Sequence, residues 1–256
     1  MIRLASKNDY IAVFDSGVGG ISVLRHLVRE LPQERFWYYG DSANAPYGTR
    51  PTEQIRALTF AAAAHLMEQG IKALVLACNT ATAAAAKALR AAYPELIIIG
   101  TEPALKVATD RFPGGTIAVL ATPATLREGK FSRLVDRCAE ECTVVRLPAP
   151  GLVELVESGR AESPETEALL APLLAPWHGK LDAVVLGCTH YPFAASTIAR
   201  LLGPGCAIID GGPGIAAQTR RRLEQAGLLR TGEGALLWEN SDPRLLELSK
   251  TLLKEG

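Results

Sequence analysis

Short apolar runs alternate with helical patterns along the chain. The runs are rich in β-branched and aromatic residues, end in small or polar residues, and precede stretches with helical periodicity. Strands that alternate with helices in this way predict βαβ units and a mostly parallel sheet. In the first half of the chain, strands are predicted over residues 11–14, 36–39, 73–76 and 96–99.

Local signals set the bounds of the helices between these strands. Pro32 cannot continue a helix, Thr52 is a good N-cap, and Gly70 closes the helix before it. Helices are therefore predicted over residues 21–31, from Thr52 to about residue 69, after Thr80 to about residue 93, and from Thr125 to about Cys142.

The second half of the chain repeats the scheme of the first. Residues 117–120 (Ile-Ala-Val-Leu) echo residues 11–14 (Ile-Ala-Val-Phe), and residues 183–189, ending in Gly-Cys-Thr, echo residues 73–79, ending in Ala-Cys-Asn. Further strands are predicted over residues 143–147 and 207–209. We predict an α/β fold with two similar parallel-sheet lobes, related by a pseudo-two-fold axis, and the active site in the cleft between them. The first lobe would hold residues 1–100 plus 209–256, and the second residues 101–208.

Composition and charge narrow the class of protein. The 256 residues carry 27 basic and 27 acidic side chains, and this balance argues against nucleic acid or an anionic membrane as a partner. The basic triplet at residues 220–222 is expected on a solvated helix face. No apolar run approaches the ~18 residues of a membrane-spanning helix, and the first ten residues lack the apolar core of a signal peptide. We therefore expect a cytoplasmic protein whose five cysteines are thiols.

Two of the cysteines stand at strand-to-helix turns. Cys78 and Cys188 each follow a buried strand, and residues at this end of a parallel sheet line the ligand site. A helix N-terminus favours the reactive thiolate. Free cysteine is often only a small buried hydrophobe, and this description is expected for Cys138, Cys142 and Cys206. For the pair at the turns we favour a chemical role.

Acid or base groups are predicted beside each thiol. His190 lies two residues after Cys188, and imidazole titrates near neutral pH. Asp15 ends a strand and opens the turn Gly17-Val18-Gly19-Gly20, where it either caps the helix or places a carboxylate in the crevice. The backbone N–H groups of this turn suit a substrate carboxylate. His26, His65 and His178 are expected to be structural and without partners.

Two thiols suffice for the inversion of a stereocentre. One group removes a proton from one face of Cα and the other delivers a proton to the opposite face, so one starts as thiolate and the other as thiol. The carbanion then needs preorganised donors in a dry site. Metal binding is disfavoured because the histidines form no cluster with the spacing of metal ligands. Pyridoxal phosphate is disfavoured because no lysine lies at a strand-end turn.

Four blocks, in order, resemble the glutamate racemases of the aspartate/glutamate racemase family. They are residues 15–20 (DSGVGG), residues 40–48 (GD, then PYG), residues 77–81 (ACNTA) and residues 187–192 (GCTHYP). The resemblance spans nearly the whole chain. It implies interconversion of L- and D-glutamate for peptidoglycan synthesis in the cytoplasm, without cofactor or metal, by a homodimer.

The resemblance also implies roles for individual residues. Cys78 would act on D-glutamate and Cys188 on L-glutamate, with Asp15 and His190 as their assisting groups. A further acid of the family lies in a Leu-Val-Glu segment, which Glu157 fits, although Glu154 is a near alternative. The substrate contacts implied are Asp15, Ser16, Pro46, Tyr47, Gly48, Asn79, Thr80, Thr189 and His190.

Three alternatives stay open at this point. A related two-cysteine racemase acting on aspartate would share the fold and the thiols. A cysteine hydrolase would use Cys188 and His190 and leave Cys78 structural. A nucleotide-binding module on residues 15–20 is disfavoured because the third glycine of the dinucleotide fingerprint is missing.

Overall fold

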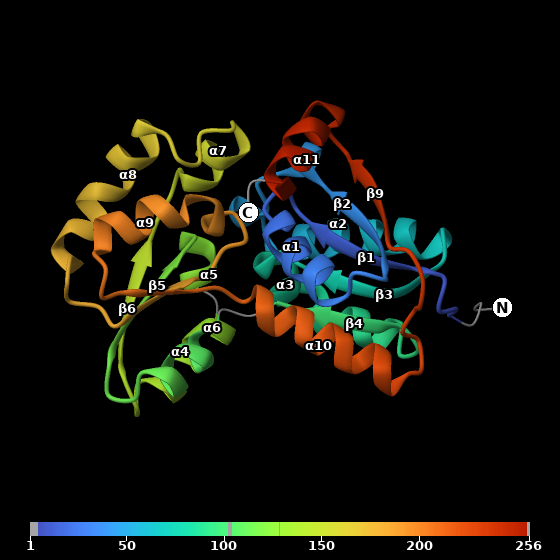
Figure 1. Cartoon of the computed structure of the whole chain (residues 1–256), viewed down its shortest axis with the longest axis horizontal. Coiled ribbons are helices and arrows are strands. Elements are labelled where there is room, and N and C mark those ends of the chain that lie inside the picture. Colours follow the sequence, from blue (N-terminus) through green and yellow to red (C-terminus); the bar gives the residue numbers. More distant parts are fainter. Residues whose placement is uncertain (1–4, 102–103, 128, 255–256) are drawn as a thin grey trace. The chain divides into compact units, whose positions relative to one another are not determined.

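The computed structural model describes residues 5–101, 104–127 and 129–254. The chain divides into two compact units of helices and strands (Figure 1). Unit 1 comprises Met1–Thr101 and Gly212–Gly256, and unit 2 comprises Glu102–Gly211. Each unit is built on its own parallel sheet, which confirms the predicted fold class of two parallel-sheet α/β sets.

Unit 1 contains a five-stranded parallel sheet in the order β4-β3-β1-β2-β9. Its strands are β1 (Tyr10–Asp15), β2 (Arg35–Gly40), β3 (Ile71–Leu76), β4 (Ile97–Gly100) and β9 (Ala235–Asn240). Its helices are α1 (Ile21–Glu30), α2 (Thr52–Glu68), α3 (Asn79–Ala92), α10 (Gly212–Gln225) and α11 (Leu246–Lys254). Short 3-10 helices are η1 (Ser42–Asn44), η2 (Tyr47–Thr49) and η5 (Pro243–Leu245).

Apart from Lys72 in β3 and Asp15 at the end of β1, the central strands of unit 1 are apolar because both of their faces are covered. Every residue of β3 is buried, and so is every residue of β1 after Tyr10. Helices α2 and α3 pack together over a core cluster that contains Phe14, Leu74 and Cys78, while α1 packs against α10. The sheet is thus held between helices, and its strand ends are fixed in place.

Unit 2 contains a four-stranded parallel sheet in the order β6-β5-β7-β8. Its strands are β5 (Thr116–Ala121), β6 (Thr143–Pro148), β7 (Ala183–Leu186) and β8 (Ala207–Ile209). Its helices are α4 (Leu105–Arg111), α5 (Pro123–Arg127), α6 (Gly129–Cys138), α7 (Leu152–Glu157), α8 (Pro164–Leu174) and α9 (Ala195–Leu202). The 3-10 helices are η3 (Ala175–Trp177) and η4 (Tyr191–Ala194).

The strand order supports the internal duplication inferred from the sequence. The order β4-β3-β1-β2 in unit 1 corresponds to β8-β7-β5-β6 in unit 2, so each strand occupies the same place in its own sheet. Strand β9, which pairs with β2 at the edge of the first sheet, has no counterpart among the described strands of the second. The pseudo-two-fold axis stays a prediction.

Two helix predictions were wrong in detail. The N-cap of α2 is Pro51, and Thr52 is its first helical residue, because the fixed φ of proline suits the entry to a helix. The helix predicted from Thr125 to Cys142 begins at Pro123, ends as α6 at Cys138, and leaves Cys142 in the turn beyond it. Residue 128 of that prediction lies outside the described residues.

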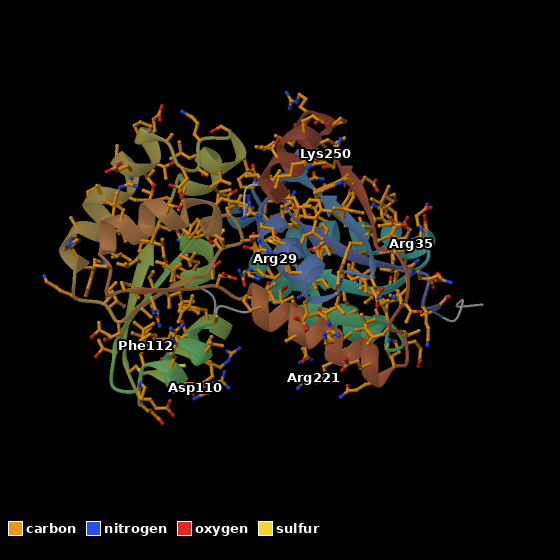
Figure 2. The ribbon with its side chains drawn as sticks, viewed as in Figure 1. Arg29, Arg35, Asp110, Phe112, Arg221 and Lys250 are labelled. Atoms are coloured by element: carbon orange, nitrogen blue, oxygen red, sulfur yellow. The ribbon has the colours of Figure 1, made fainter. Side chains whose placement is uncertain are left out.

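Charged side chains line the outer faces of the helices. Arg221, which points outward from α10 (Figure 2), and Arg222 are exposed, as expected for a solvated helix face. Arg220 differs, because it is half-buried and pairs with Glu30 of α1. Among the described helices, none has both the length and the apolar character needed to cross a bilayer.

Candidate active site

In unit 1, polar residues gather where β1 and β3 end. The two strands are parallel, and their register pairs Phe14 with Leu76. Two residues further along, Ser16 therefore comes level with Cys78, and the Ser16 Oγ lies 3.3 Å from the Cys78 Sγ. The sequence placed both residues in the site, but their contact depends on this pairing of strands.

Cys78 is the N-cap residue of α3, as predicted from its position after a strand. Its Sγ accepts a hydrogen bond from the Ala81 N–H at 3.4 Å, and the residue is 6% exposed. A backbone donor and the positive end of the helix both stabilise negative charge on the sulfur. Asn79 and Thr80 are the first two residues of α3 and come directly after it in the sequence.

Asp15 is fully buried at the end of β1. Its Oδ1 accepts a hydrogen bond from the Gly17 N–H at 2.9 Å, whereas the N-cap of α1 is Gly20. Asp15 thus stabilises the turn. It does not cap α1, so the capping role, which was one of the two predicted for Asp15, was wrong. A Cβ on Gly20 would lie 2.6 Å from the Asp15 Cβ and 3.0 Å from the Ala77 Cβ. Only glycine there lets the Asp15 turn pack against the residue that precedes Cys78.

The loop after β2 is fastened to the same place by Asp41, a residue of the block 40–48 for which the sequence predicted no role. Asp41 is buried, its N–H donates to the Asp15 carbonyl at 2.9 Å, and its carboxylate accepts bonds from Tyr47 (2.7 Å) and Asn44 (3.0 Å). Burial, followed by the hydrogen bond to Asp41, raises the pKa of Tyr47 far above its usual value. The phenol therefore stays protonated and donates to Asp41.

The expected substrate contacts of this loop differ in exposure. Tyr47 is buried under the loop, whereas Pro46 is exposed and Gly48 half-buried. A signal for Asp41 was present in the sequence, because it follows a strand directly, in the way that Asp15 ends one. Strand-end position alone could have singled it out.

In unit 2, Cys188 occupies the place that Cys78 has in unit 1. The register pairs Leu120 of β5 with Leu186 of β7, which brings Thr122 level with Cys188. Thr122 is thus the counterpart of Ser16, and its Oγ1 lies 3.0 Å from the Thr125 Oγ1. Thr122 was not predicted as a site residue, although the internal repeat marks its position as the counterpart of Ser16.

Cys188, His190 and Glu157 form a chain of polar contacts. The Cys188 Sγ lies 3.8 Å from the His190 Nδ1, and the His190 Nε2 lies 3.0 Å from the Glu157 Oε1. His190 is 4% exposed, Thr189 is buried, and Cys188 is half-buried. Glu157 ends α7, whereas Glu154 on the same helix is exposed. The contacts therefore make Glu157 the carboxylate partner of His190.

The two thiols differ in the segment that comes next in the chain. The 3-10 helix η4, with Pro192 in its first turn, comes after Cys188, and the α-helix α9 begins only at Ala195. The predicted strand-to-helix turn is therefore present at Cys188, but the helix that comes first is a 3-10 helix and not an α-helix. Proline suits the start of a helical turn, so the chain enters a short 3-10 segment first. Cys78 has backbone and hydroxyl partners, and Cys188 has an imidazole.

The other cysteines and histidines lie apart from these clusters. Cys138, Cys142 and Cys206 are buried, as expected, and burial raises the pKa of Cys206 to about 11. The expectation that the remaining histidines lack partners was wrong. His65 pairs with Glu239 at 2.9 Å, and the His178 Nδ1 lies 2.9 Å from the Leu201 carbonyl. Among the residues described, no group of three or more His, Cys, Asp or Glu side chains could hold a metal ion.

Each unit thus presents one thiol at the end of an equivalent strand, with its own hydrogen-bonding groups. Such a thiol can take up or release a proton at a carbon acid, and hydroxyl, carboxylate or imidazole neighbours can stabilise the charge that this leaves. The chain supplies two such groups with different surroundings.

Comparison with known proteins agrees with this arrangement. The family model for Asp/Glu/Hydantoin racemase matches residues 11–219. A glutamate racemase from Clostridium botulinum is 44% identical over 98% of this chain and 99% of its own length. Among solved structures, a glutamate racemase from Thermus thermophilus in complex with β-chloro-D-alanine is 36% identical, with a TM-score of 0.83 over 98% of this chain and 94% of that one.

A second solved structure extends the likeness. A glutamate racemase from Francisella tularensis in complex with D-glutamate is 28% identical, with a TM-score of 0.85 over 98% of this chain and 95% of that one. The similarity therefore includes both units and every block that carries a predicted site residue. This chain belongs to the Asp/Glu/Hydantoin racemase family.

Proposed function

We propose that this chain is a glutamate racemase, which interconverts L- and D-glutamate by moving the Cα proton between Cys78 and Cys188. The observation that carries the proposal is the pair of thiols at equivalent strand ends, each in a different polar cluster. Glutamate as the substrate is supported by relatives of that name at 44% identity over nearly the full length.

The reaction needs two steps at one carbon. A thiolate removes the proton from Cα, so the C–H bond breaks and an S–H bond forms while the electron pair moves into the carboxylate as an enolate. The thiol on the other side then delivers its proton to the opposite face, and its S–H bond breaks as the new C–H bond forms. Cys78 would start from D-glutamate and Cys188 from L-glutamate.

The assisting groups would differ on the two sides. Asp15 and Ser16 would serve the Cys78 side, where Ser16 contacts the sulfur directly. His190 would serve the Cys188 side, with Glu157 holding the imidazole in place and stabilising it when it is protonated. This asymmetry suits an enzyme that starts from either enantiomer.

The side chains at these turns would bind the substrate. Pro46, Tyr47 and Gly48 would contribute from the loop after β2, and Asn79, Thr80 and Thr189 from the turns next to the two cysteines. The register of β5 and β7 adds Thr122 to this set. The product would supply D-glutamate for peptidoglycan, in the cytoplasm, from a homodimer that needs neither metal nor pyridoxal phosphate.

Racemisation assays test the substrate directly. Circular dichroism or chiral chromatography is run with each enantiomer of glutamate and of aspartate, with and without EDTA. We expect conversion of both glutamate enantiomers at rates that EDTA does not change. Conversion of aspartate but not glutamate would overturn the assignment.

One observation also fits a different class of enzyme. The chain Cys188–His190–Glu157 has the order of groups found in cysteine hydrolases, where a base activates the thiol and a third group orients the base. In that case Cys78 would be structural, and Cys78→Ala would keep most of the hydrolytic activity. A racemase requires both thiols.

A further inference from the structure

Among the described strands, β9 at the edge of the first sheet has no counterpart in the second sheet. Its end reaches the loop after β2. It is parallel to β2 over its whole length, with Arg35 opposite Ala235 and Gly40 opposite Asn240. Because the strands are parallel and in register, both end at the same edge of the sheet. The loop of residues 41–47 leaves β2 at that edge, and we call it the Asp41 loop.

Ser241, directly after β9, makes two hydrogen bonds at this edge. Its N–H donates to the Gly40 carbonyl at 2.9 Å, which continues the ladder between β9 and β2. Its Oγ accepts a bond from the Ala43 N–H at 2.9 Å. Ala43 lies in η1, between Asp41 and Tyr47 in the chain. The Ser241 hydroxyl therefore holds the first half of the Asp41 loop.

Asn240 ends β9 and lies opposite Gly40 of β2. It is 7% exposed, and its Oδ1 accepts a bond from the Asp242 N–H at 2.8 Å. A Cβ on Gly40 would lie 2.7 Å from the Asn240 Nδ2 and 2.6 Å from the Gly17 carbonyl oxygen. The end of β9 and the turn that carries Asp15 thus both lie against Gly40, directly before the Asp41 loop.

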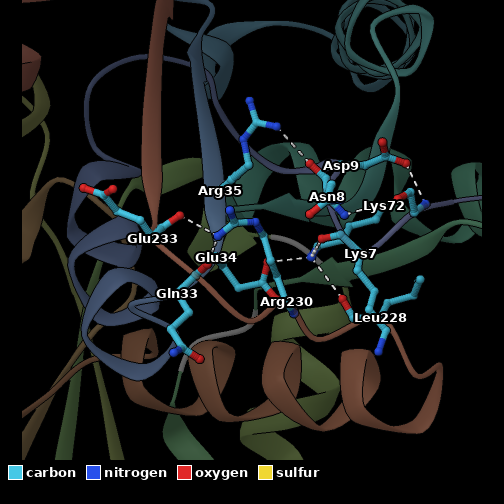
Figure 3. A network of polar contacts seen from close by, with 11 residues as sticks. Lys7, Asn8, Asp9, Gln33, Glu34, Arg35, Lys72, Leu228, Arg230 and Glu233 are labelled. Atoms are coloured by element: carbon cyan, nitrogen blue, oxygen red, sulfur yellow. Dashed lines mark hydrogen bonds and ion pairs between the residues drawn. The ribbon is translucent and has the colours of Figure 1, made fainter.

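The segment leading into β9 is fastened by a buried ion pair. The Lys72 Nζ donates to the Glu34 Oε2 at 2.5 Å and to the carbonyls of Lys7 (2.7 Å) and Leu228 (3.0 Å), as Figure 3 shows. The Glu34 Oε1 accepts a bond from the Arg230 N–H at 2.9 Å. Neither side chain of the ion pair is more than 1% exposed. The chain is therefore fixed before it enters β9.

Side chains of β9 also contact helix α2 and strand β2. Glu239 of β9 pairs with His65 of α2 at 2.9 Å, and the rings of Trp238 and Tyr38 lie 5.8 Å apart. With anchors at its start and along its length, β9 offers Ser241 a fixed position. A hydroxyl on a fixed support can order a loop that is otherwise only partly buried.

The geometry points to Ser241 as a positioning residue that holds the Asp41 loop in its substrate-binding conformation. The inference rests on the proposed function, since it assumes that this loop binds glutamate. Without the hydroxyl, the Ala43 N–H turns to water and the loop occupies other conformations. Substrate must then select the competent one, which weakens binding of both enantiomers without altering the chemical step.

The test compares two serine-to-alanine variants of the C-terminal segment. Ser241→Ala removes the bond to the loop, whereas Ser249→Ala removes a bond from the Ser249 Oγ of α11 to the Leu245 carbonyl at 2.8 Å. We expect Ser241→Ala to raise KM for both enantiomers about three- to tenfold, the worth of one hydrogen bond, with kcat within about twofold. Ser249→Ala should leave KM unchanged, and Ser241→Thr should restore it.

A second readout does not depend on turnover. Hydrogen exchange followed by mass spectrometry should show faster exchange of the amides of residues 42–45 and Tyr47 in Ser241→Ala than in wild type or Ser249→Ala. Unchanged KM and exchange in Ser241→Ala, or equal effects in Ser249→Ala, would overturn the inference. A wild-type protein that does not racemise glutamate would overturn the proposed function instead, and the exchange data would still decide the role of Ser241.

Discussion

The contact between His190 and Glu157 gives a sharp prediction about the Cys188 side. Glu157→Gln keeps the shape of the side chain and removes its charge. The His190 Nε2 then bonds to a neutral amide instead of a carboxylate at 3.0 Å, in a place where the imidazole is 5% and the carboxylate 21% exposed. A hydrogen bond to a charged group is worth about 1–2 kcal/mol more than a neutral one.

That difference acts when His190 carries a proton during the reaction. Because about 1.36 kcal/mol corresponds to a factor of ten in rate, we expect kcat to fall about 5- to 30-fold. Progress curves by circular dichroism, started from each enantiomer, give kcat and KM in both directions. Since the two enantiomers have equal free energy, kcat/KM must fall by the same factor in both directions, which is an internal check.

The control is Glu154→Gln, which changes an exposed carboxylate on the same helix. It should leave kcat within about twofold of wild type. A Glu157→Gln enzyme with wild-type kcat, or an equal loss in Glu154→Gln, would refute the reasoning. The first result would mean that Glu157 only packs against His190.

Further predictions concern the support of the site. Lys72→Met leaves the buried Glu34 carboxylate without its cation, so urea denaturation should show a loss of about 3–5 kcal/mol in unfolding free energy, and a loss below about 1 kcal/mol would contradict this. Gly40→Ala forces the end of β9 or the Gly17 carbonyl to move, and racemase activity should fall about 10–100-fold, whereas unchanged activity would show that the Asp15 turn adjusts freely. Because burial raises the pKa of Cys206 to about 11, alkylation of this thiol should be slow at about pH 8, and its rate should rise with pH as the thiolate fraction grows. Peptide mass spectrometry measures the labelling, and a Cys206 labelled at about pH 8 as fast as the half-buried Cys188 would contradict this prediction.

Much of the fold could be predicted because its central strands are buried on both faces. Such strands leave unbroken apolar runs, and the strands β1, β3, β5 and β7 were all placed from them. The positions of the two cysteines could then be predicted as well, since residues just after such a run lie at the edge of the sheet. Local sequence therefore carried the parts of the site that lie on central strands.

The parts that were missed depend on pairing between distant segments. Strand β9 begins with a short apolar run, residues 235–238 (Ala-Leu-Leu-Trp), but these four residues alternate between exposed and half-buried. The strand pairs with one about 200 residues earlier in the chain, so the run alone does not place it in this sheet. The contacts of Ser16 with Cys78 and of His65 with Glu239 arise from strand register and helix packing. The predicted start of α2 differs from the observed one by a single residue, because the pattern of a sequence marks a helix end only to within one or two residues.

The central claim is that two thiols move one proton, and deuterium incorporation tests it most directly. Each enantiomer of glutamate is incubated in D2O with wild type, Cys78→Ser and Cys188→Ser, and deuterium at Cα is measured separately in substrate and product. For the wild type, we predict deuterium in the product enantiomer and little in the remaining substrate, because the proton that returns comes from the second thiol. Both variants should lose racemisation. Normal racemisation by both variants, or products that retain the original hydrogen, would contradict the two-thiol account.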